Sequence, residues 1–309
     1  MRVLVTGGAG FIGSHIAEEI TKQGKRVIVV DNLSNGTTDN FGSWWDDDLC
    51  TFIEADISSP TISWLRHYLR GVDVVFHEAC SKCTICRDNP YKDLQTNAWG
   101  SWNIFNMARQ AKVKKIVHAS TGSTLDGEPV SFYGVSKLAG ESYLRAFRDY
   151  YPDFQYTALR YYHVYGPRQD DSDSGGVIPI FIRHIMMNEP VTIFGDGKQV
   201  RHFTYVKDVV GVNFAVANRR RSTETVFCTD GEIFDVASDV NMSIKELASR
   251  LHHIIDKKSN IKFAPRRDGD IDTFAFTKLG IESVYGNKFV MFGDGILETI
   301  DWYREKYGK

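Results

Sequence analysis

A tyrosine and a lysine four residues apart are the pair in this sequence best suited to acid–base chemistry. They stand in Tyr133-Gly-Val-Ser-Lys137, within a stretch, 132–150, whose pattern predicts a long helix. Because residues four apart share one face of a helix, both side chains would point into the same cleft. An ammonium beside a phenol favours the phenolate and lowers its pKa from about 10. The pair therefore predicts a tyrosine general base, although surface pairs with this spacing are also common.

The strand predicted before this helix ends in hydroxyl side chains. Residues 115–119 predict a buried strand, and Ser120-Thr121-Gly122-Ser123-Thr124 follows directly. A hydroxyl at this strand end could hydrogen-bond the substrate oxygen whose proton moves. Thr121 is the first candidate for this role and Ser123 the second. The alternative is an ordinary turn rich in serine and threonine.

A glycine-rich turn near the N-terminus predicts a dinucleotide site. The apolar run 2–6 predicts a strand, the turn Gly7-Gly8-Ala9-Gly10-Phe11-Ile12-Gly13 follows, and residues 16–20 predict an amphipathic helix. Glycine permits a tight turn and a close approach to a diphosphate. The N-terminus of the helix attracts the anion through its free N–H groups and its dipole.

An acidic residue at the end of the second predicted strand selects the cofactor. Asp31 follows the run 26–30 and lies 18 positions after Gly13. A carboxylate there suits the ribose hydroxyls of NAD and would repel the 2′-phosphate of NADP. The sequence therefore favours NAD, and its oxidised ring would lower the pKa of Tyr133 further.

The elements that would position these residues alternate along the first half of the chain. Further strands are predicted at 51–55, 72–76 and 156–160, and a further long helix at 93–111. This rhythm indicates an α/β fold with a doubly wound parallel sheet of the Rossmann type. We expect an NAD-binding domain over 1–165, to which later segments return, and a smaller α/β substrate lobe over 166–309. The less regular lobe has predicted helices at 178–187, 243–255 and 293–303 and a strand at 191–194.

Composition excludes several other classes of protein. The 309 residues carry a formal charge of -2, so nothing indicates a nucleic-acid surface or a polybasic membrane patch. No apolar run is long enough to span a bilayer, and the N-terminus is unlike a signal peptide. Five cysteines, an odd number, do not suggest a disulfide scaffold. We expect a cytoplasmic protein with neither nucleic acid nor membrane as partner.

Three of the cysteines stand in Cys80-Ser-Lys-Cys83-Thr-Ile-Cys86, a spacing that can bind a metal or an iron–sulfur cluster. No fourth cysteine is close in sequence. We therefore expect no metal and interpret the three as small, partly buried thiols.

Five stretches together resemble the extended short-chain dehydrogenase/reductases. They are Thr6-Gly-Gly-Ala-Gly-Phe-Ile-Gly-Ser-His15, Asp31-Asn-Leu-Ser34, Tyr133-x-x-x-Lys137, Arg160-Tyr-Tyr-His-Val-Tyr-Gly-Pro167 and Phe194-Gly-Asp-Gly-Lys-Gln-Val-Arg201. Within that family the chain is most similar to nucleotide-sugar epimerases of the UDP-glucose 4-epimerase type. The resemblance implies NAD, a nucleotide-diphosphate sugar (a UDP-sugar favoured), inversion at C4 through a transient 4-keto intermediate, and a homodimer.

The resemblance also implies a role for each matching position. The catalytic group would be Thr121, Tyr133 and Lys137. The cofactor would contact Gly7, Gly10, Phe11, Ile12 and Gly13 with its diphosphate, Asp31, Asn32, Asn35 and Gly36 with its ribose, Asp56 and Ile57 with adenine, and Ala79, Lys82, Asn97 and Tyr161 nearer the nicotinamide. The nucleotide sugar would contact Val177, Arg201 and Arg267.

The chain departs from the family pattern at several positions. Tyr133 lies 12 positions after Thr121, a shorter loop than usual, which should open one wall of the sugar pocket. His163 and Gly176 stand where asparagines are common, and His202 replaces an acid. The family's dehydratases place Asp-Glu after the catalytic threonine, where this chain has Gly122-Ser123. A related dehydratase, decarboxylase or reductase and a non-catalytic nucleotide-sugar sensor remain the alternatives.

Overall fold

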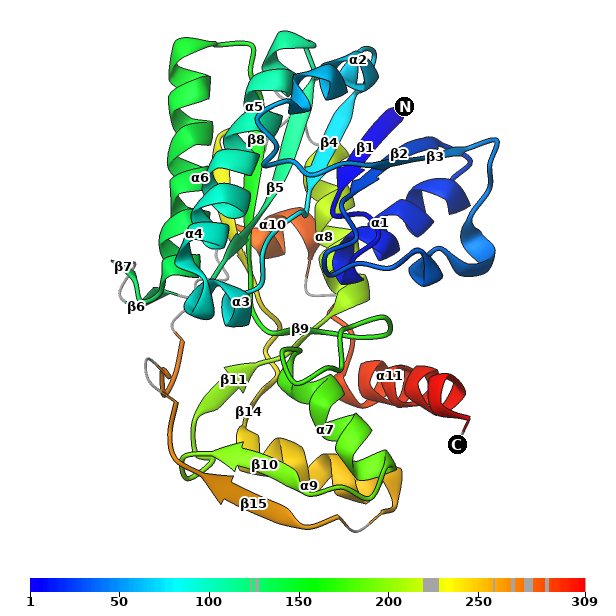
Figure 1. Cartoon of the computed structure of the whole chain (residues 1–309), viewed down its shortest axis with the longest axis vertical. Coiled ribbons are helices and arrows are strands. Elements are labelled where there is room, and N and C mark those ends of the chain that lie inside the picture. The colour runs from blue at the N-terminus through cyan, green and yellow to red at the C-terminus, as the bar shows by residue number, and fades with distance from the viewer. Residues whose placement is uncertain are drawn as a thin grey trace.

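Seven parallel strands form the centre of the computed structural model, which describes residues 1–122, 124–125, 128–218, 228–257, 259–267, 270–274, 280–286 and 289–308. The strands lie in the order β13-β8-β5-β4-β1-β2-β3 (Figure 1). Their bounds are β1 (Arg2–Thr6), β2 (Arg26–Asp31), β3 (Cys50–Glu54), β4 (Val74–His77), β5 (Lys115–Thr121), β8 (Tyr156–Tyr161) and β13 (Glu232–Val236). The predicted doubly wound sheet is confirmed. Its order reverses between β1 and β4, and open α/β sheets bind ligands at such a point.

Helices cover both faces of the sheet because neighbouring strand residues point to opposite sides. In β1, Val3 and Val5 pack with α1 (Phe11–Lys22), α8 (Val206–Asn218) and α10 (Ile281–Tyr285). Leu4 faces the other side, where α2 (Arg66–Leu69), α5 (Ser101–Gln110) and α6 (Phe132–Tyr150) pack. The two apolar cores hold the strand ends in fixed positions.

A smaller lobe packs beyond the C-terminal ends of the strands (Figure 1). Its own apolar core joins α7 (Val177–Met186), α9 (Ile244–Ile255) and α11 (Phe292–Tyr307). Short strand pairs complete it: β10 (Val191–Phe194) with β15 (Ile261–Ala264), β11 (Val200–His202) with β14 (Asn241–Ser243), and β9 (Val164–Tyr165) with β12 (Thr204–Tyr205).

The chain passes between the domain that contains the sheet and the smaller lobe more than once. After the first pass through the lobe, α8 packs against α1 and β13 pairs with β8 as the seventh strand of the sheet. Neither α8 nor β13 is among the elements expected from the sequence. β13 is a short edge strand whose place depends on pairing with a distant segment.

Several further elements are short. They are η1 (Thr38–Asn40), η2 (Gly42–Trp44), η3 (Ile62–Leu65), α3 (Cys83–Asp88), α4 (Pro90–Asp93), β6 (Thr124–Leu125), β7 (Glu128–Pro129) and η4 (Leu94–Gly100), which is π-helical. The helix expected over 93–111 is therefore interrupted by a π-helical segment before α5. Within the part of the chain described, no helix combines the length and apolar character needed to cross a membrane.

Candidate functional site: a cavity at the C-terminal ends of the strands

The glycine turn after β1 is packed so closely that side chains would not fit. A Cβ on Gly13 would lie 2.2 Å from the carbonyl oxygen of Gly7, and one on Gly7 would lie 2.6 Å from the backbone nitrogen of Ala79. Gly7 also has a φ of 67°, which favours glycine. Gly10 caps α1 without a side-chain hydrogen bond, so the first N–H groups of the helix remain available to an anion. The turn fits the diphosphate of a dinucleotide.

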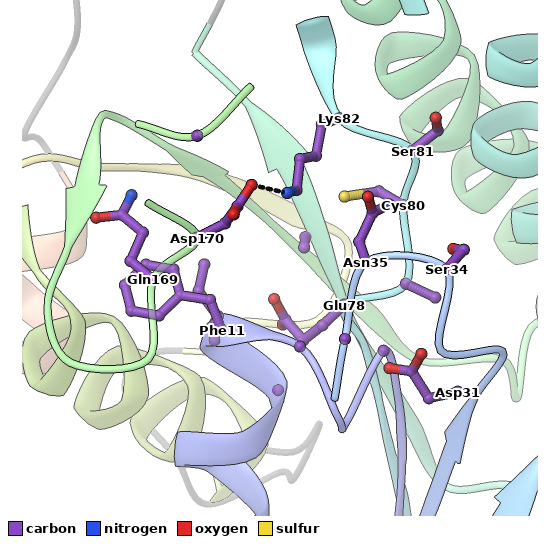
Figure 2. Close-up of a pocket in the computed structure, with 18 of the residues that line it drawn as sticks. Phe11, Asp31, Ser34, Asn35, Glu78, Cys80, Ser81, Lys82, Gln169 and Asp170 are labelled. Atoms are coloured by element: carbon purple, nitrogen blue, oxygen red, sulfur yellow. Dashed lines mark hydrogen bonds and ion pairs between the residues drawn. The ribbon is translucent and has the colours of Figure 1, made fainter. Parts of the chain in front are cut away.

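A cavity of about 790 Å³ opens beside this turn, at the sheet edge where the strand order reverses. Figure 2 shows Phe11 of α1, Asp31 at the end of β2, and Glu78 and Lys82 of the loop after β4 around it. Most of the site residues expected from the sequence line it: Gly7, Gly10, Phe11, Ile12, Gly13, Asp31, Asn32, Asn35, Gly36, Ile57, Ala79, Lys82, Thr121, Tyr133, Lys137 and Tyr161. The fold thus brings the expected cofactor and catalytic residues into one space.

The carboxylate of Asp31 is fixed by backbone donors. Its Oδ2 accepts from the N–H of Ala9 at 3.0 Å, and its Oδ1 accepts from the N–H of Leu33 at 2.9 Å. Burial raises the pKa of Asp31, while these hydrogen bonds act in the opposite direction. Asp56 does not line the cavity; it accepts from Nδ2 of Asn32 at 3.0 Å. Asp56 therefore acts on the cavity through Asn32.

Asn97 also lies behind the cavity wall. Its Oδ1 accepts from the N–H of Ser81 at 2.7 Å, and its Nδ2 donates to the Ser81 carbonyl at 3.1 Å and to Asp93 at 2.7 Å. This buried side chain fixes the loop after β4. On the same loop, the ammonium of Lys82 pairs with Asp170 across the cavity (Figure 2).

The tyrosine–lysine pair lies at the start of α6. The hydroxyl of Ser131 caps the helix by accepting from the N–H of Gly134 at 3.1 Å, so Tyr133 belongs to the first turn. The positive end of a helix dipole favours a phenolate there. Lys137 is almost fully buried one turn later, and Thr121 ends β5 across the cavity. Ser123 lies outside the described residues.

The pKa of Tyr133 lies well above its usual value. Burial is the largest cause, followed by Cys80, Cys83 and Cys86. The phenol therefore needs more positive charge than this environment supplies before it can act as a base. The ammonium of Lys137 is already part of this environment, and an oxidised nicotinamide would supply the additional positive charge.

The three cysteines of the C-x-x-C-x-x-C stretch surround this tyrosine as free thiols. Cys80 and Cys83 line the cavity, whereas Cys86 is buried and donates to the Ser81 carbonyl at 3.4 Å. Burial raises the pKa of the Cys83 and Cys86 thiols. In the described parts of the chain no three or more histidine, cysteine or acidic side chains form a group able to hold a metal ion.

The residues expected to hold the nucleotide sugar do not line this cavity. Arg201 is buried, pairs with Asp270 and lies over the ring of Phe274 at 5.1 Å. The guanidinium of Arg267 lies 3.9 Å from the ring centroid of Phe194. Val177 begins α7, directly after Gly176, which does line the cavity. The two arginines lie in the lobe. A ligand that reached them would replace their present contacts with Asp270, Phe274 and Phe194.

Sequence reasoning missed two groups in the cavity wall. Glu78 follows β4 directly, and a polar residue at the end of a buried strand could have marked it. The segment 168–171 also lines the cavity, although no motif in the sequence marks it. Two ion pairs fix this segment: Arg168 with Glu18 at 2.5 Å, and Asp171 with Lys306 at 2.9 Å. The hydroxyl of Tyr303 also donates to the Gln169 carbonyl.

Comparisons with known proteins agree with this geometry. The model of the family described as "NAD dependent epimerase/dehydratase family" matches residues 3–237. The chain is 32% identical to a putative UDP-glucose 4-epimerase of Methanocaldococcus jannaschii, with 98% of each chain covered. It is 31% identical to a UDP-N-acetyl-alpha-D-glucosaminuronate decarboxylase of Bacillus cytotoxicus, again over 98% of each. The crystal structure of UDP-glucose 4-epimerase from Thermotoga maritima with UDP-glucose has a TM-score of 0.90 at 32% identity, covering 99% of this chain and 100% of that one.

Proposed function

The chain belongs to the NAD-dependent epimerase/dehydratase family, and we propose that within it the protein is a 4-epimerase of a UDP-sugar. The supporting observation is that Thr121, Tyr133 and Lys137 line the same cavity as the diphosphate turn. UDP-glucose and UDP-galactose are the favoured pair of substrates, because relatives and structural neighbours include proteins named for that activity.

The residues around the cavity suit a reversible oxidation at C4. NAD supplies a hydride acceptor that later returns the hydride. Tyr133 removes the proton of the C4 hydroxyl, Lys137 stabilises the phenolate, and Thr121 donates a hydrogen bond to the sugar oxygen. The keto-sugar then rotates within the cavity and presents the opposite face of C4. As that face is reduced, Tyr133 returns the proton to the sugar oxygen.

The residue after Thr121 favours epimerisation over dehydration. Elimination of water needs an acid near the leaving hydroxyl, and the family's dehydratases carry one directly after the threonine. Here a Cβ on Gly122 would lie 2.2 Å from the ring of Tyr162, which is buried. A carboxylate therefore has no room at this position.

His163 suggests that the substrate pocket of this protein prefers a different sugar or base from the usual family members. It lines the cavity, and burial, helped by the charge of Arg201, lowers its pKa to about 3. Its buried Nδ1 has no hydrogen-bond partner among the described residues. A neutral imidazole thus lines the cavity at a position where the family pattern commonly has an asparagine.

Incubation with a panel of nucleotide sugars in D₂O, followed by NMR, tests the proposal. The panel contains UDP-glucose, UDP-galactose, UDP-N-acetylglucosamine, UDP-glucuronate and dTDP-glucose. We expect inversion at C4 of at least one UDP-sugar without deuterium at C4, because the hydride is returned internally. Release of CO₂ would instead indicate a decarboxylase, and loss of the C6 hydroxyl with deuterium at C5 would indicate a dehydratase. No turnover together with tight binding would favour the sensor.

Removing the charge of Arg267 is expected to weaken substrate binding. We propose that Arg267, Arg201 and Val177 hold the nucleoside diphosphate, whose paired oxygens match a guanidinium fork. Arg267→Met should raise KM for the UDP-sugar about 10- to 100-fold and change kcat little, because a charged hydrogen bond contributes about 1.5–3 kcal/mol. Steady-state kinetics measures both, and Arg250→Met, whose arginine pairs with Glu246 on an exposed helix face, is the control. An unchanged KM would remove Arg267 from the substrate site.

We further propose that the protein is a cytoplasmic homodimer. Exposed aromatic and apolar side chains gather on η4 and α6: Trp99, Phe132, Val135, Tyr143 and Tyr150. Such a patch is typical of an interface. Light scattering coupled to gel filtration should give twice the 35.0 kDa mass of the chain, and Val135→Glu should shift the protein towards monomer.

A further inference from the structure

Glu78 is a carboxyl group buried in the cavity wall, and no part of the proposed reaction uses it. It follows β4, is 9% exposed, and lines the cavity together with Lys137 and Tyr161. Nearly all of its surface is thus removed from water, and an ionised carboxylate in such a place needs a partner. The Glu78 carboxylate therefore requires a positively charged partner in the cavity.

A chain of hydrogen bonds fixes the orientation of this carboxyl. The hydroxyl of Tyr161 donates to Oε1 of Glu78 at 3.0 Å. The same hydroxyl accepts from Nδ2 of Asn213 at 2.8 Å, and Asn213 also donates to the Val209 carbonyl within α8. Because an amide NH₂ can only donate, the Tyr161 proton must point towards Glu78. Glu78 is therefore held as an acceptor.

The position of Glu78 lies on the path of the dinucleotide. A Cβ on Gly7 would lie 2.9 Å from the backbone carbon of Glu78, so the diphosphate turn packs directly against it. Asp31 marks the adenosine end of the cavity, and Tyr133 with Lys137 marks the other end. Figure 2 shows Glu78 apart from Asp31. Glu78 contacts Tyr161 and lies near Lys137, where the nicotinamide half of the cofactor belongs.

We propose that the Glu78 carboxylate is the counter-charge of the oxidised nicotinamide ring and makes the protein bind NAD⁺ more tightly than NADH. The ring carries one positive charge when oxidised and none when reduced, so a nearby fixed carboxylate distinguishes the two. The tighter binding of NAD⁺ lowers the tendency of the bound cofactor to keep a hydride. The 4-keto sugar is then reduced again before it can leave.

The ionisation of Glu78 agrees with this role. Burial raises its pKa to about 7, against the opposing effects of the Tyr161 hydrogen bond and the Lys137 ammonium. A cation arriving in the cavity favours the ionised form, and a neutral ring does not. The inference depends on NAD as cofactor and is independent of which sugar is the substrate.

The test compares the affinities of NAD⁺ and NADH for protein stripped of its cofactor, without any sugar. Glu78→Gln keeps the shape and the acceptor for Tyr161 but removes the charge. We expect the ratio of the NADH to the NAD⁺ dissociation constant to fall about 10-fold or more, as one unit of charge at short range in a partly buried site implies. Calorimetric titration measures both constants, and Glu78→Asp should retain most of the wild-type ratio.

The matched control is Asp39→Asn, which removes a carboxylate at the adenosine end of the same cavity. Both cofactor forms share that end, so both constants should move together and the ratio should stay unchanged. An unchanged ratio in a folded Glu78→Gln protein would overturn the proposal. Should that variant fail to fold, equal affinities of the wild-type protein for NAD⁺ and NADH would overturn it equally. Because these titrations contain no sugar, their outcome does not depend on whether the protein is an epimerase. A failure of this inference can therefore be distinguished from a failure of the proposed function.

Discussion

Tyr133→Phe is expected to lower kcat for epimerisation about 10²- to 10⁴-fold, the usual contribution of a positioned acid–base group. The variant loses only the hydroxyl that accepts the substrate proton. The ring still fills its place in the first turn of α6, and the diphosphate turn is unaffected. The dissociation constant of NAD should therefore change less than about threefold by calorimetric titration. A loss of turnover with retained cofactor binding would identify Tyr133 as a catalytic residue.

The control is Tyr150→Phe, at the far end of the same helix. Tyr150 is 81% exposed in the single chain and lies outside the cavity, and phenylalanine keeps its ring for the proposed dimer contact. The value of kcat should therefore stay within about twofold of wild type. Lys137→Met should resemble Tyr133→Phe in kcat. The surroundings hold the pKa of the Tyr133 phenol well above its usual range even with the ammonium present, and removing a nearby positive charge disfavours the phenolate further. Substantial turnover by Tyr133→Phe would require another base and would contradict the proposed mechanism.

Local signals in the sequence were enough to place the tyrosine–lysine pair on one helix. The helix predicted over 132–150 is observed as Phe132–Tyr150, because Ser131 caps its start and an amphipathic pattern runs through its length. The glycine turn also follows from local rules, since Gly7 has a positive φ and a Cβ on Gly13 would meet the carbonyl oxygen of Gly7. These features depend on residues close in sequence, and their chemistry can be interpreted without a fold.

Features built from distant contacts could not be predicted in the same way. β13 gains its place by pairing with β8, and the expected helix over 93–111 contains a π-helical segment from which Asn97 reaches Ser81. Only the fold shows that Glu78 lies beside Tyr161, which Asn213 contacts in turn. The family resemblance assigned Asp56 and Asn97 to the cofactor, but the structure places both behind residues that line the cavity. Sequence identifies the chemistry, and the fold decides whether a residue contacts the ligand or positions another that does.

Gly13→Ala is expected to weaken NAD binding by about 100-fold or more and to destabilise the fold. The new Cβ would lie 2.2 Å from the Gly7 carbonyl oxygen and 2.9 Å from the Cα of Gly8, and neither backbone atom can move without opening the turn. Overpacking of this kind costs about 1–3 kcal/mol in stability. The affinity suffers more, because the N–H groups at the start of α1 no longer point at the diphosphate. Calorimetric titration and thermal melts without cofactor measure the two effects.

Gly293→Ala is the matched control for this substitution. Gly293 lies in the first turn of α11, and a Cβ there would meet nothing within 4 Å. Alanine is favoured over glycine in a helix by roughly 0.5–1 kcal/mol, so this variant should melt at the wild-type temperature or slightly above it and bind NAD unchanged. The same chemical change is thus expected to act with opposite sign on stability at the two positions. Wild-type affinity for NAD in Gly13→Ala would show that the cofactor does not lie on the glycine turn, and the placement of Tyr133 beside its nicotinamide would fail with it.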